Sequence, residues 1–228
     1  MSPIPTIGQL KQLVAHLQSV IFPDYFPSVV APADLCLPDA FWAELPSIAR
    51  LVHTDVDAVL HNDPAVTDRG EVILCYPLTY EMVHYRAAHA LYCLGVARIP
   101  RMLTELAHAR TGIDIHPAAQ IGDYFCIDHG TGVVIGETAV IGSHVVLYQG
   151  VTLGARNFEY DADGKPMDIP RHPILEDNVT VYSNTSILGR VTIGHDTIIG
   201  GNVWLTQDVP ANSVVLQSTP EIRIKEKR

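Results

Sequence analysis

The feature that most constrains this chain's fold is a six-residue repeat, which runs without interruption from Leu175 to Pro210. Each hexad opens with an aliphatic residue and carries a small or β-branched residue four places later. The opening residues are Leu175, Val181, Ile187, Ile193, Ile199 and Leu205, and the later ones are Val179, Thr185, Val191, Thr197, Val203 and Val209. This period differs from the periods of about 2 and about 3.6 that mark a strand and a helix. It predicts a parallel β-helix, in which each hexad forms one side and one corner of a triangular coil.

A second stretch of the same repeat precedes the first. Its phase slips by two residues at a segment that contains Gly130 and Gly132, and we expect a local bulge there. Between residues 155 and 173 the repeat gives way to a segment rich in turn formers, which predicts a loop insertion of functional importance. The aliphatic positions are Ile115, Ile121, Ile127 and Val133 before the slip, and Ile135, Ile141, Leu147 and Leu153 after it.

Apolar residues in the first half of the chain follow a helical spacing instead. This spacing predicts a helix over residues 7–22, a second over 39–61 and a third region over 78–110, which Pro100 divides into two helices. The segment Asp68-Arg69-Gly70 has the composition of a turn.

Together these patterns predict an α+β chain. An all-helical domain over residues 1–112 is followed by a left-handed parallel β-helix of hexapeptide repeats over 113–217, with its loop insertion at 155–173. A charged C-terminal tail occupies residues 218–228.

Composition excludes several classes of partner. The formal charge of −10 argues against a nucleic acid or an anionic membrane surface as the main partner. No signal peptide and no apolar run long enough to cross a bilayer is present, so we expect a cytoplasmic protein. The four cysteines lack metal-site spacing, and we expect them to be buried free thiols. They are Cys36, Cys75, Cys93 and Cys126.

Several polar residues stand out against the repeat. A carboxylate, an imidazole and a guanidinium suit general-base chemistry on a small zwitterion, although polar residues at solenoid corners more often bind solvent or turn backbone. The residues in question are Asp63, Asp114, Asp128, His129, Arg171 and His172.

Five segments of the chain resemble bacterial serine O-acetyltransferases, and one of them is Asp114-Ile115-His116-Pro117-Ala118-Ala119. The most specific is Asp128-His129-Gly130-Thr131-Gly132-Val133-Val134-Ile135-Gly136-Glu137-Thr138-Ala139, and the remaining ones are Asp63-Pro64-Ala65, Gln149-Gly150-Val151-Thr152-Leu153-Gly154 and Arg171-His172-Pro173. The resemblance extends over roughly residues 60–215. It implies transfer of an acetyl group from acetyl-CoA to the hydroxyl of L-serine, giving O-acetyl-L-serine in cysteine biosynthesis.

The resemblance also implies a role for each polar residue. His129 is the general base that takes the serine proton, and Asp114 orients its imidazole. Asp63 and Asp128 hold the serine amino group, while Arg171 and His172 hold its carboxylate.

Acetyl-CoA is implied as a co-substrate, with no bound cofactor and no metal. The family binds its arm in a groove between two subunits, near Gly154, Ser183 and Gly201 in this chain, with a backbone N–H near Gly154 as the oxyanion donor. A homotrimer follows from the resemblance, alone or as a dimer of trimers. The family's C-terminal isoleucine plugs the active site of O-acetylserine sulfhydrylase; because this chain ends in Lys-Arg, we expect no complex by that route.

Three alternatives remain open at this point. A hexapeptide acetyltransferase could act on another acceptor such as homoserine. A zinc lyase like the γ-carbonic anhydrases would need three histidines at an interface, and His129, His144 and His172 are available. A third alternative is an inactive scaffold that keeps only the solenoid.

Overall fold

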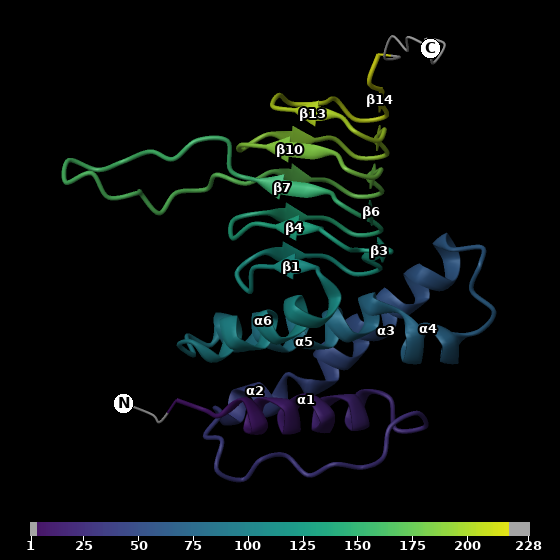
Figure 1. The fold of residues 1–228 in the computed structure, drawn as a ribbon, viewed down its shortest axis with the longest axis vertical. Helices are drawn as coiled ribbons and strands as arrows, with labels where there is room; N and C mark the ends of the chain where they lie inside the picture. Colours follow the sequence, from purple (N-terminus) through teal and green to yellow (C-terminus); the bar gives the residue numbers. More distant parts are fainter. Residues whose placement is uncertain (1–3, 219–228) are drawn as a thin grey trace, which may run out of the picture.

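The computed structural model describes residues 4–218, and the end of the predicted tail lies outside these residues. A layer of helices forms the base of the molecule, and a β-helix stands on it as a stack of coils (Figure 1). This arrangement confirms the α+β class and the left-handed β-helix expected from the hexads. The helices are α1 (Ile7–Ile21), α2 (Asp39–Ala43), α3 (Leu45–Asn62), α4 (Arg69–Cys75), α5 (Pro77–Cys93) and α6 (Ile99–Thr111).

Most helix boundaries follow local sequence signals. Thr6 accepts a hydrogen bond from the backbone of Gln9 and the Gln9 side chain accepts one in return, which forms a capping box at the start of α1. Pro100 lies in the first turn of α6, where its missing N–H costs nothing. Gly112 ends α6 in the left-handed conformation. The division at Pro100 is therefore confirmed.

Two expectations for the helical half are wrong. The single helix over 39–61 is two helices, because the chain bends at Glu44 and α3 starts afresh with a proline in its first turn. The expected turn at residues 68–70 is the start of α4. Asp68 caps this helix by accepting a hydrogen bond from the backbone N–H of Glu71 at 2.9 Å.

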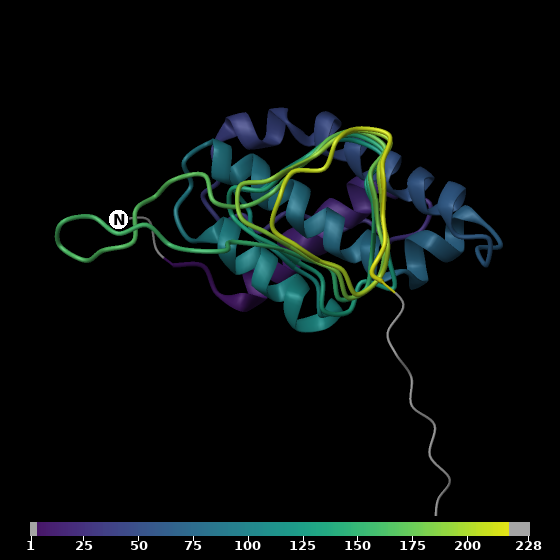
Figure 2. The ribbon, with the colours of Figure 1, turned by 90° about the horizontal axis from the view of Figure 1, so that it is seen from above.

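The β-helix consists of short strands arranged in three parallel sheets, one on each side of a triangular prism (Figure 2). The first sheet contains β1 (Asp114–Ile115), β4 (Val134–Ile135), β7 (Thr152–Gly154), β10 (Ser186–Leu188) and β13 (Trp204–Leu205). The second contains β2 (Gln120–Ile121), β5 (Val140–Ile141), β8 (Ile174–Leu175) and β11 (Thr192–Ile193). The third contains β3 (Cys126–Asp128), β6 (Val146–Tyr148), β9 (Thr180–Val181), β12 (Ile198–Ile199) and β14 (Val214–Val215).

Strand register explains the phase slip. Ile135 stacks on Ile115, twenty positions earlier (135 − 115 = 20), whereas Leu153 stacks on Ile135 after eighteen (153 − 135 = 18). The two extra residues fall at the corner after β3, where Gly130 and Gly132 have φ values of +86° and +80°. The expected bulge is confirmed, and the stacked aliphatic side chains of the hexads are buried except for that of Ile121, which is partly buried.

Left-handed backbone recurs at the corners of later coils, and it explains the Asn residues of the hexads. Asn178, Asn184 and Asn202 all have φ near +60°, a conformation that Asn tolerates better than most residues. Gly194 has a different role, since a Cβ there would lie 2.3 Å from the backbone nitrogen of Ala211 in the next coil.

Buried polar contacts join the helical layer to the first coil. Arg86 of α5 forms an ion pair with Asp55 of α3 at 2.9 Å, with side chains 4% and 1% exposed. The same guanidinium donates to the carbonyl oxygens of Ile121 and Gly122 at 2.5 and 2.6 Å. Tyr85 donates to the Ala119 carbonyl at 2.5 Å. These contacts fix the first coil of the β-helix, around β2, on α3 and α5.

The segment between β7 and β8 leaves the prism as a long hairpin, which projects to one side in Figures 1 and 2. An antiparallel bridge between Tyr160 and Pro166 joins its two arms. Among residues 4–218, no helix is long and apolar enough to cross a membrane. All four cysteines are free, but the expectation that they are buried holds only for Cys126, because the other three lie in the exposed parts of the helical layer.

Candidate functional site

The sequence-predicted site residues lie at two different corners of the prism. We call the corner between the third and first sheets the His129 corner; it consists of residues 129–133, 149–151, 182–185 and 200–203. The Arg171 corner, between the first and second sheets, consists of residues 116–119, 136–139, 155–173 and 189–191. Within one chain the first sheet separates the two groups. Each corner therefore carries half of the predicted site.

The first half-site gathers carboxylates around the end of β3. Asp63 ends α3, and it lines one small pocket with Asp128, Tyr76 and Tyr148. Tyr76 donates its hydroxyl hydrogen to Asp63 Oδ2 at 2.6 Å, and the backbone N–H of Ala65 donates to Oδ1 at 2.8 Å. These donors hold the pKa of Asp63 below its usual value, with the Tyr76 hydroxyl as the larger cause. Asp63 is thus a charged acceptor suited to an ammonium group.

His129 extends from this corner into solvent. Its backbone is left-handed, with φ +56°, and 73% of its side chain is exposed. Its Nε2 lies 3.9 Å from Asp128 Oδ1. Among the ion pairs within 4.0 Å in the described chain, none joins His129 to Asp114; the Asp114 carboxylate lies 3.6 Å from Arg101 instead. Asp114 nonetheless lies next to this corner in the stack of coils. It begins β1, which pairs with β4 on the far side of the corner, and the N–H of Gly132 in the corner donates to the carbonyl of Gly112.

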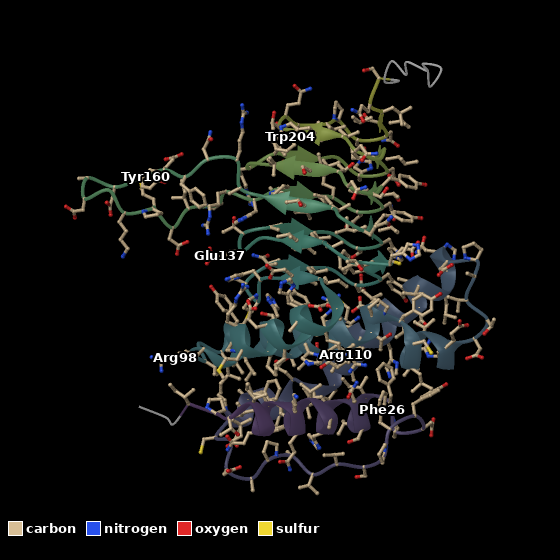
Figure 3. All side chains as sticks on the ribbon, viewed as in Figure 1. Phe26, Arg98, Arg110, Glu137, Tyr160 and Trp204 are labelled. Atoms are coloured by element: carbon tan, nitrogen blue, oxygen red, sulfur yellow. The ribbon has the colours of Figure 1, made fainter. Side chains whose placement is uncertain are left out.

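The second half-site contains Arg171 and His172, which end the hairpin. Arg171 forms an ion pair with Glu137, and its Nη1 lies 3.8 Å from Asp168. Figure 3 shows Glu137 at the edge of the prism from which the hairpin carrying Tyr160 leaves. The Arg171 Nε is buried without a hydrogen-bond partner in the described residues. Part of the guanidinium is therefore engaged within the chain, and the rest can donate to a further anion.

His172 is held in one tautomer by Thr138. The Thr138 backbone N–H donates to His172 Nδ1 at 3.1 Å, so the ring proton is on Nε2 in the neutral form. Burial and the charge of Arg171 lower the pKa of His172 to about 4. A Cβ on Gly136 would lie 2.1 Å from His172 Nε2, so only glycine leaves room for the ring. His172 is therefore a neutral N–H donor at pH 7.

The predicted acetyl-CoA positions divide in the same way. Ser183 and Gly201 are stacked on successive coils of the His129 corner, where the backbone N–H of Asn202 donates to the Ser183 carbonyl at 2.9 Å. Gly154 ends β7 at the Arg171 corner. Trp204 of β13 is 72% exposed on the outer face of the first sheet, between the two corners (Figure 3).

Three residues near the site were not singled out from the sequence. Thr138 accepts from the backbone N–H groups of Arg171 and His172 through its hydroxyl oxygen, and Glu137 pairs with Arg171. Both lie inside the family-like segment that begins at Asp128, which was the available signal. Tyr76 lies outside the family-like segments and has no such signal.

The histidines named for a zinc site do not converge within one chain. His129 and His172 lie at the corners described above, and His144 lies at the third corner, where it stacks on Tyr124 at 4.5 Å. Over residues 4–218, no group of three or more His, Cys, Asp or Glu side chains is arranged to hold a metal ion.

Known proteins resemble this chain in sequence and in fold. The family model "Bacterial transferase hexapeptide (six repeats)" matches residues 172–207. A plasmid serine acetyltransferase of Synechococcus elongatus is 47% identical over 197 residues, which cover 86% of this chain and 62% of the relative. The chain thus spans less than two thirds of that relative's length.

Other relatives match over more of their length. A Helicobacter pylori serine acetyltransferase is 41% identical over 75% of this chain and 96% of its own. The crystal structure of serine acetyltransferase isoform 3 from Entamoeba histolytica, in complex with cysteine, has a TM-score of 0.81 and 32% identity, and covers 95% of this chain and 84% of its own. On these matches, the chain belongs to the serine acetyltransferase family.

Proposed function

We propose that this protein is a serine O-acetyltransferase, which transfers the acetyl group of acetyl-CoA to the hydroxyl of L-serine in cysteine biosynthesis. The observation that carries the proposal is the complementarity of the two half-sites. One presents the carboxylates of Asp63 and Asp128 beside an accessible imidazole, and the other presents Arg171 and the N–H of His172. An α-amino acid has the matching ammonium and carboxylate, with its hydroxyl between them.

In this proposal His129 is the general base. A serine hydroxyl is a weak nucleophile at pH 7, whereas a thioester carbonyl is a good electrophile, so catalysis requires proton removal and close positioning. His129 takes the hydroxyl proton as the oxygen attacks the thioester, and Asp114 stabilises the imidazolium after the exposed ring turns toward it. Collapse of the tetrahedral intermediate then breaks the C–S bond, and the imidazolium returns the proton to the departing CoA thiolate. The tetrahedral oxyanion accepts a hydrogen bond from a backbone N–H near Gly154. No acyl-enzyme is needed, because both substrates are bound together.

The site needs two subunits in this proposal. The His129 corner of one chain and the Arg171 corner of its neighbour form the two walls, and the acetyl-CoA arm lies between Ser183 and Gly201 on one wall and Gly154 on the other. A closed trimer supplies three such grooves. A dimer of trimers and a cytoplasmic location remain part of the proposal.

Serine is favoured over homoserine as the acceptor. The Entamoeba relative was solved with cysteine, which has the same carbon skeleton as serine with a thiol in place of the hydroxyl. A zinc lyase would require His129, His144 and His172 to meet from different chains. The Thr138 N–H donates to His172 Nδ1 and so leaves the ring proton on Nε2, which disfavours His172 as a zinc ligand.

The test is CoA-thiol release from acetyl-CoA, with L-serine and L-homoserine as separate acceptors. We expect release with serine in the wild type and a loss of about 10²-fold or more in His129→Ala, the range of general-base contributions. His144→Ala, which changes a histidine at the corner without predicted site residues, is the matched control. Release with homoserine alone would change the substrate, and no release from an assembled wild type would contradict the proposal.

A further inference from the structure

The hydrogen bond between Tyr76 and Asp63 joins the helical layer to the His129 corner. Tyr76 is the only residue between α4 and α5, and its extended backbone (φ −80°, ψ 132°) turns the chain from one helix to the next. Its side chain reaches back 13 residues to the end of α3, where the hydroxyl meets Asp63 Oδ2 at 2.6 Å. Figure 1 shows the end of α3 beside β3, with α4 below it in the helical layer, which places this contact at the half-site.

The contact fixes both oxygens of the carboxylate. Oδ1 is oriented by the Ala65 N–H and Oδ2 by the Tyr76 hydroxyl. Each carboxylate oxygen has two lone-pair directions, so each retains one for another donor. The Asp63 side chain is thus held in one orientation with its remaining acceptor sites free.

The hydrogen bond also determines the protonation states of Tyr76 and Asp63. The carboxylate raises the pKa of Tyr76 to about 12, so the phenol keeps its proton and remains a donor at any physiological pH. In return the phenol is the largest cause of the lowered pKa of Asp63. Glu71 and Asp128 are the other carboxylates that act on Tyr76, and His129 acts on Asp63.

We propose that Tyr76 is a positioning residue for the acceptor amino acid, which acts by holding the Asp63 carboxylate in place for the substrate ammonium. The inference rests on the proposed function and adds a residue that contributes to recognition of the acceptor amino acid. Tyr76 does not touch the reacting atoms. Its removal therefore weakens serine binding and leaves acetyl-CoA binding and the chemical step intact.

The discriminating variant is Tyr76→Phe, which keeps the ring and removes only the hydroxyl. We expect KM for L-serine to rise roughly tenfold, in line with the loss of a hydrogen bond to a charged group, with kcat and KM for acetyl-CoA within about twofold of wild type. Tyr80→Phe is the matched control, because Tyr80 lies one turn further along α5 and packs against His84 and Arg110 instead.

Two further readouts separate this role from a merely structural one. In an Asp63→Asn background, Tyr76→Phe should add no further loss of serine affinity, because its effect passes through the carboxylate. Without the phenol the pKa of Asp63 rises, so serine binding measured by calorimetry should be lost at a higher pH as the solution is acidified. Tyr76→Leu is the second variant for the case in which Tyr76→Phe does not assemble.

The outcomes distinguish the two proposals. A wild type without serine-dependent CoA release contradicts the proposed function itself. An active wild type with an unchanged KM for serine in Tyr76→Phe overturns the role of Tyr76 alone. Equal losses for serine and acetyl-CoA would also overturn it, since they indicate a general structural defect.

Discussion

Single residues determine the state of the two half-sites. At the Arg171 corner, Thr138 uses its backbone N–H and its hydroxyl to fix both Arg171 and His172. At the His129 corner, the Tyr76 hydroxyl orients the Asp63 carboxylate by donating a hydrogen bond to it. In each case a neutral donor or acceptor sets the tautomer or the orientation of a group that would meet substrate. The side chains of Asp63 and His172 are therefore prearranged by neighbours that carry no charge, whereas the Arg171 guanidinium is held by the carboxylate of Glu137.

Gly136→Ala tests the arrangement at His172. The added Cβ would lie 2.0 Å from His172 Cδ2, so the ring must leave its place and lose its bond to Thr138. We expect KM for serine to rise by about tenfold or more, with a stability cost of about 1–3 kcal/mol from overpacking. Gly8→Ala is the control, because the nearest atom to its added Cβ would be Thr6 Oγ1 at 3.8 Å. An unchanged KM for serine in Gly136→Ala would show that His172 does not hold the substrate.

At the scale of single residues, the sequence identifies the charged residues of the site better than the neutral residues that orient them. Asp63 and Arg171 are found because they belong to recognisable segments. Tyr76 is missed because an isolated tyrosine before a helix has the pattern of a packing residue, and its contact spans two helices. The left-handed φ of His129 is likewise a consequence of the corner and not of the residue type.

At the scale of elements, the helical layer positions the β-helix through buried polar groups. Arg86 bonds Asp55 and two carbonyl oxygens of the first coil, and Asp55 also accepts from the Phe125 N–H at 3.2 Å. Burial raises the pKa of Asp55 to about 6 in spite of its partner Arg86. Asp55 lies in α3 and Asp63 caps the end of the same helix. This network therefore also sets the position of Asp63 relative to β3.

Arg86→Met should therefore destabilise the protein strongly. The substitution leaves Asp55 buried without a cation and two carbonyl oxygens without a donor, which costs about 3–5 kcal/mol. Urea denaturation measures the free energy of unfolding. Arg101→Met, which removes exposed ion pairs with Glu105 and Asp114, is the control and should cost about 1 kcal/mol or less. Equal effects of the two substitutions would contradict the proposed importance of the buried network.

The elements differ in how well the sequence predicts them. The hexads locate the coils because each aliphatic residue stacks on its counterpart, so periodicity and packing agree. Helix α4 is missed because Asp68-Arg69-Gly70 suits a turn and a helix start equally well, and the choice depends on residues that follow. The break between α2 and α3 is missed because the apolar residues keep a helical spacing across it. Pro46 is the local signal of the break, since it lies in the first turn of α3.

At the scale of the whole molecule, one chain carries the predicted site residues in two separate groups. The first sheet lies between the His129 corner and the Arg171 corner, so no rotation of a side chain brings the two groups together. In the proposed trimer, each chain sets its His129 corner against its neighbour's Arg171 corner, and this arrangement would complete every site. The sequence predicts the residues of this site but not their division, because the hexad repeat has the same pattern at all three corners.

Subunit complementation tests this account most directly. His129→Ala supplies an intact Arg171 corner, and the double variant Arg171→Ala, His172→Ala supplies an intact His129 corner. Each homotrimer should be inactive in serine-dependent CoA release. If the two chains are unfolded, mixed in equal amounts and refolded, random assembly in a closed heterologous ring makes about one site in four intact, so about a quarter of wild-type activity should return. Mixed trimers that form, as shown by differential tags, and yet stay inactive would contradict a site shared between subunits.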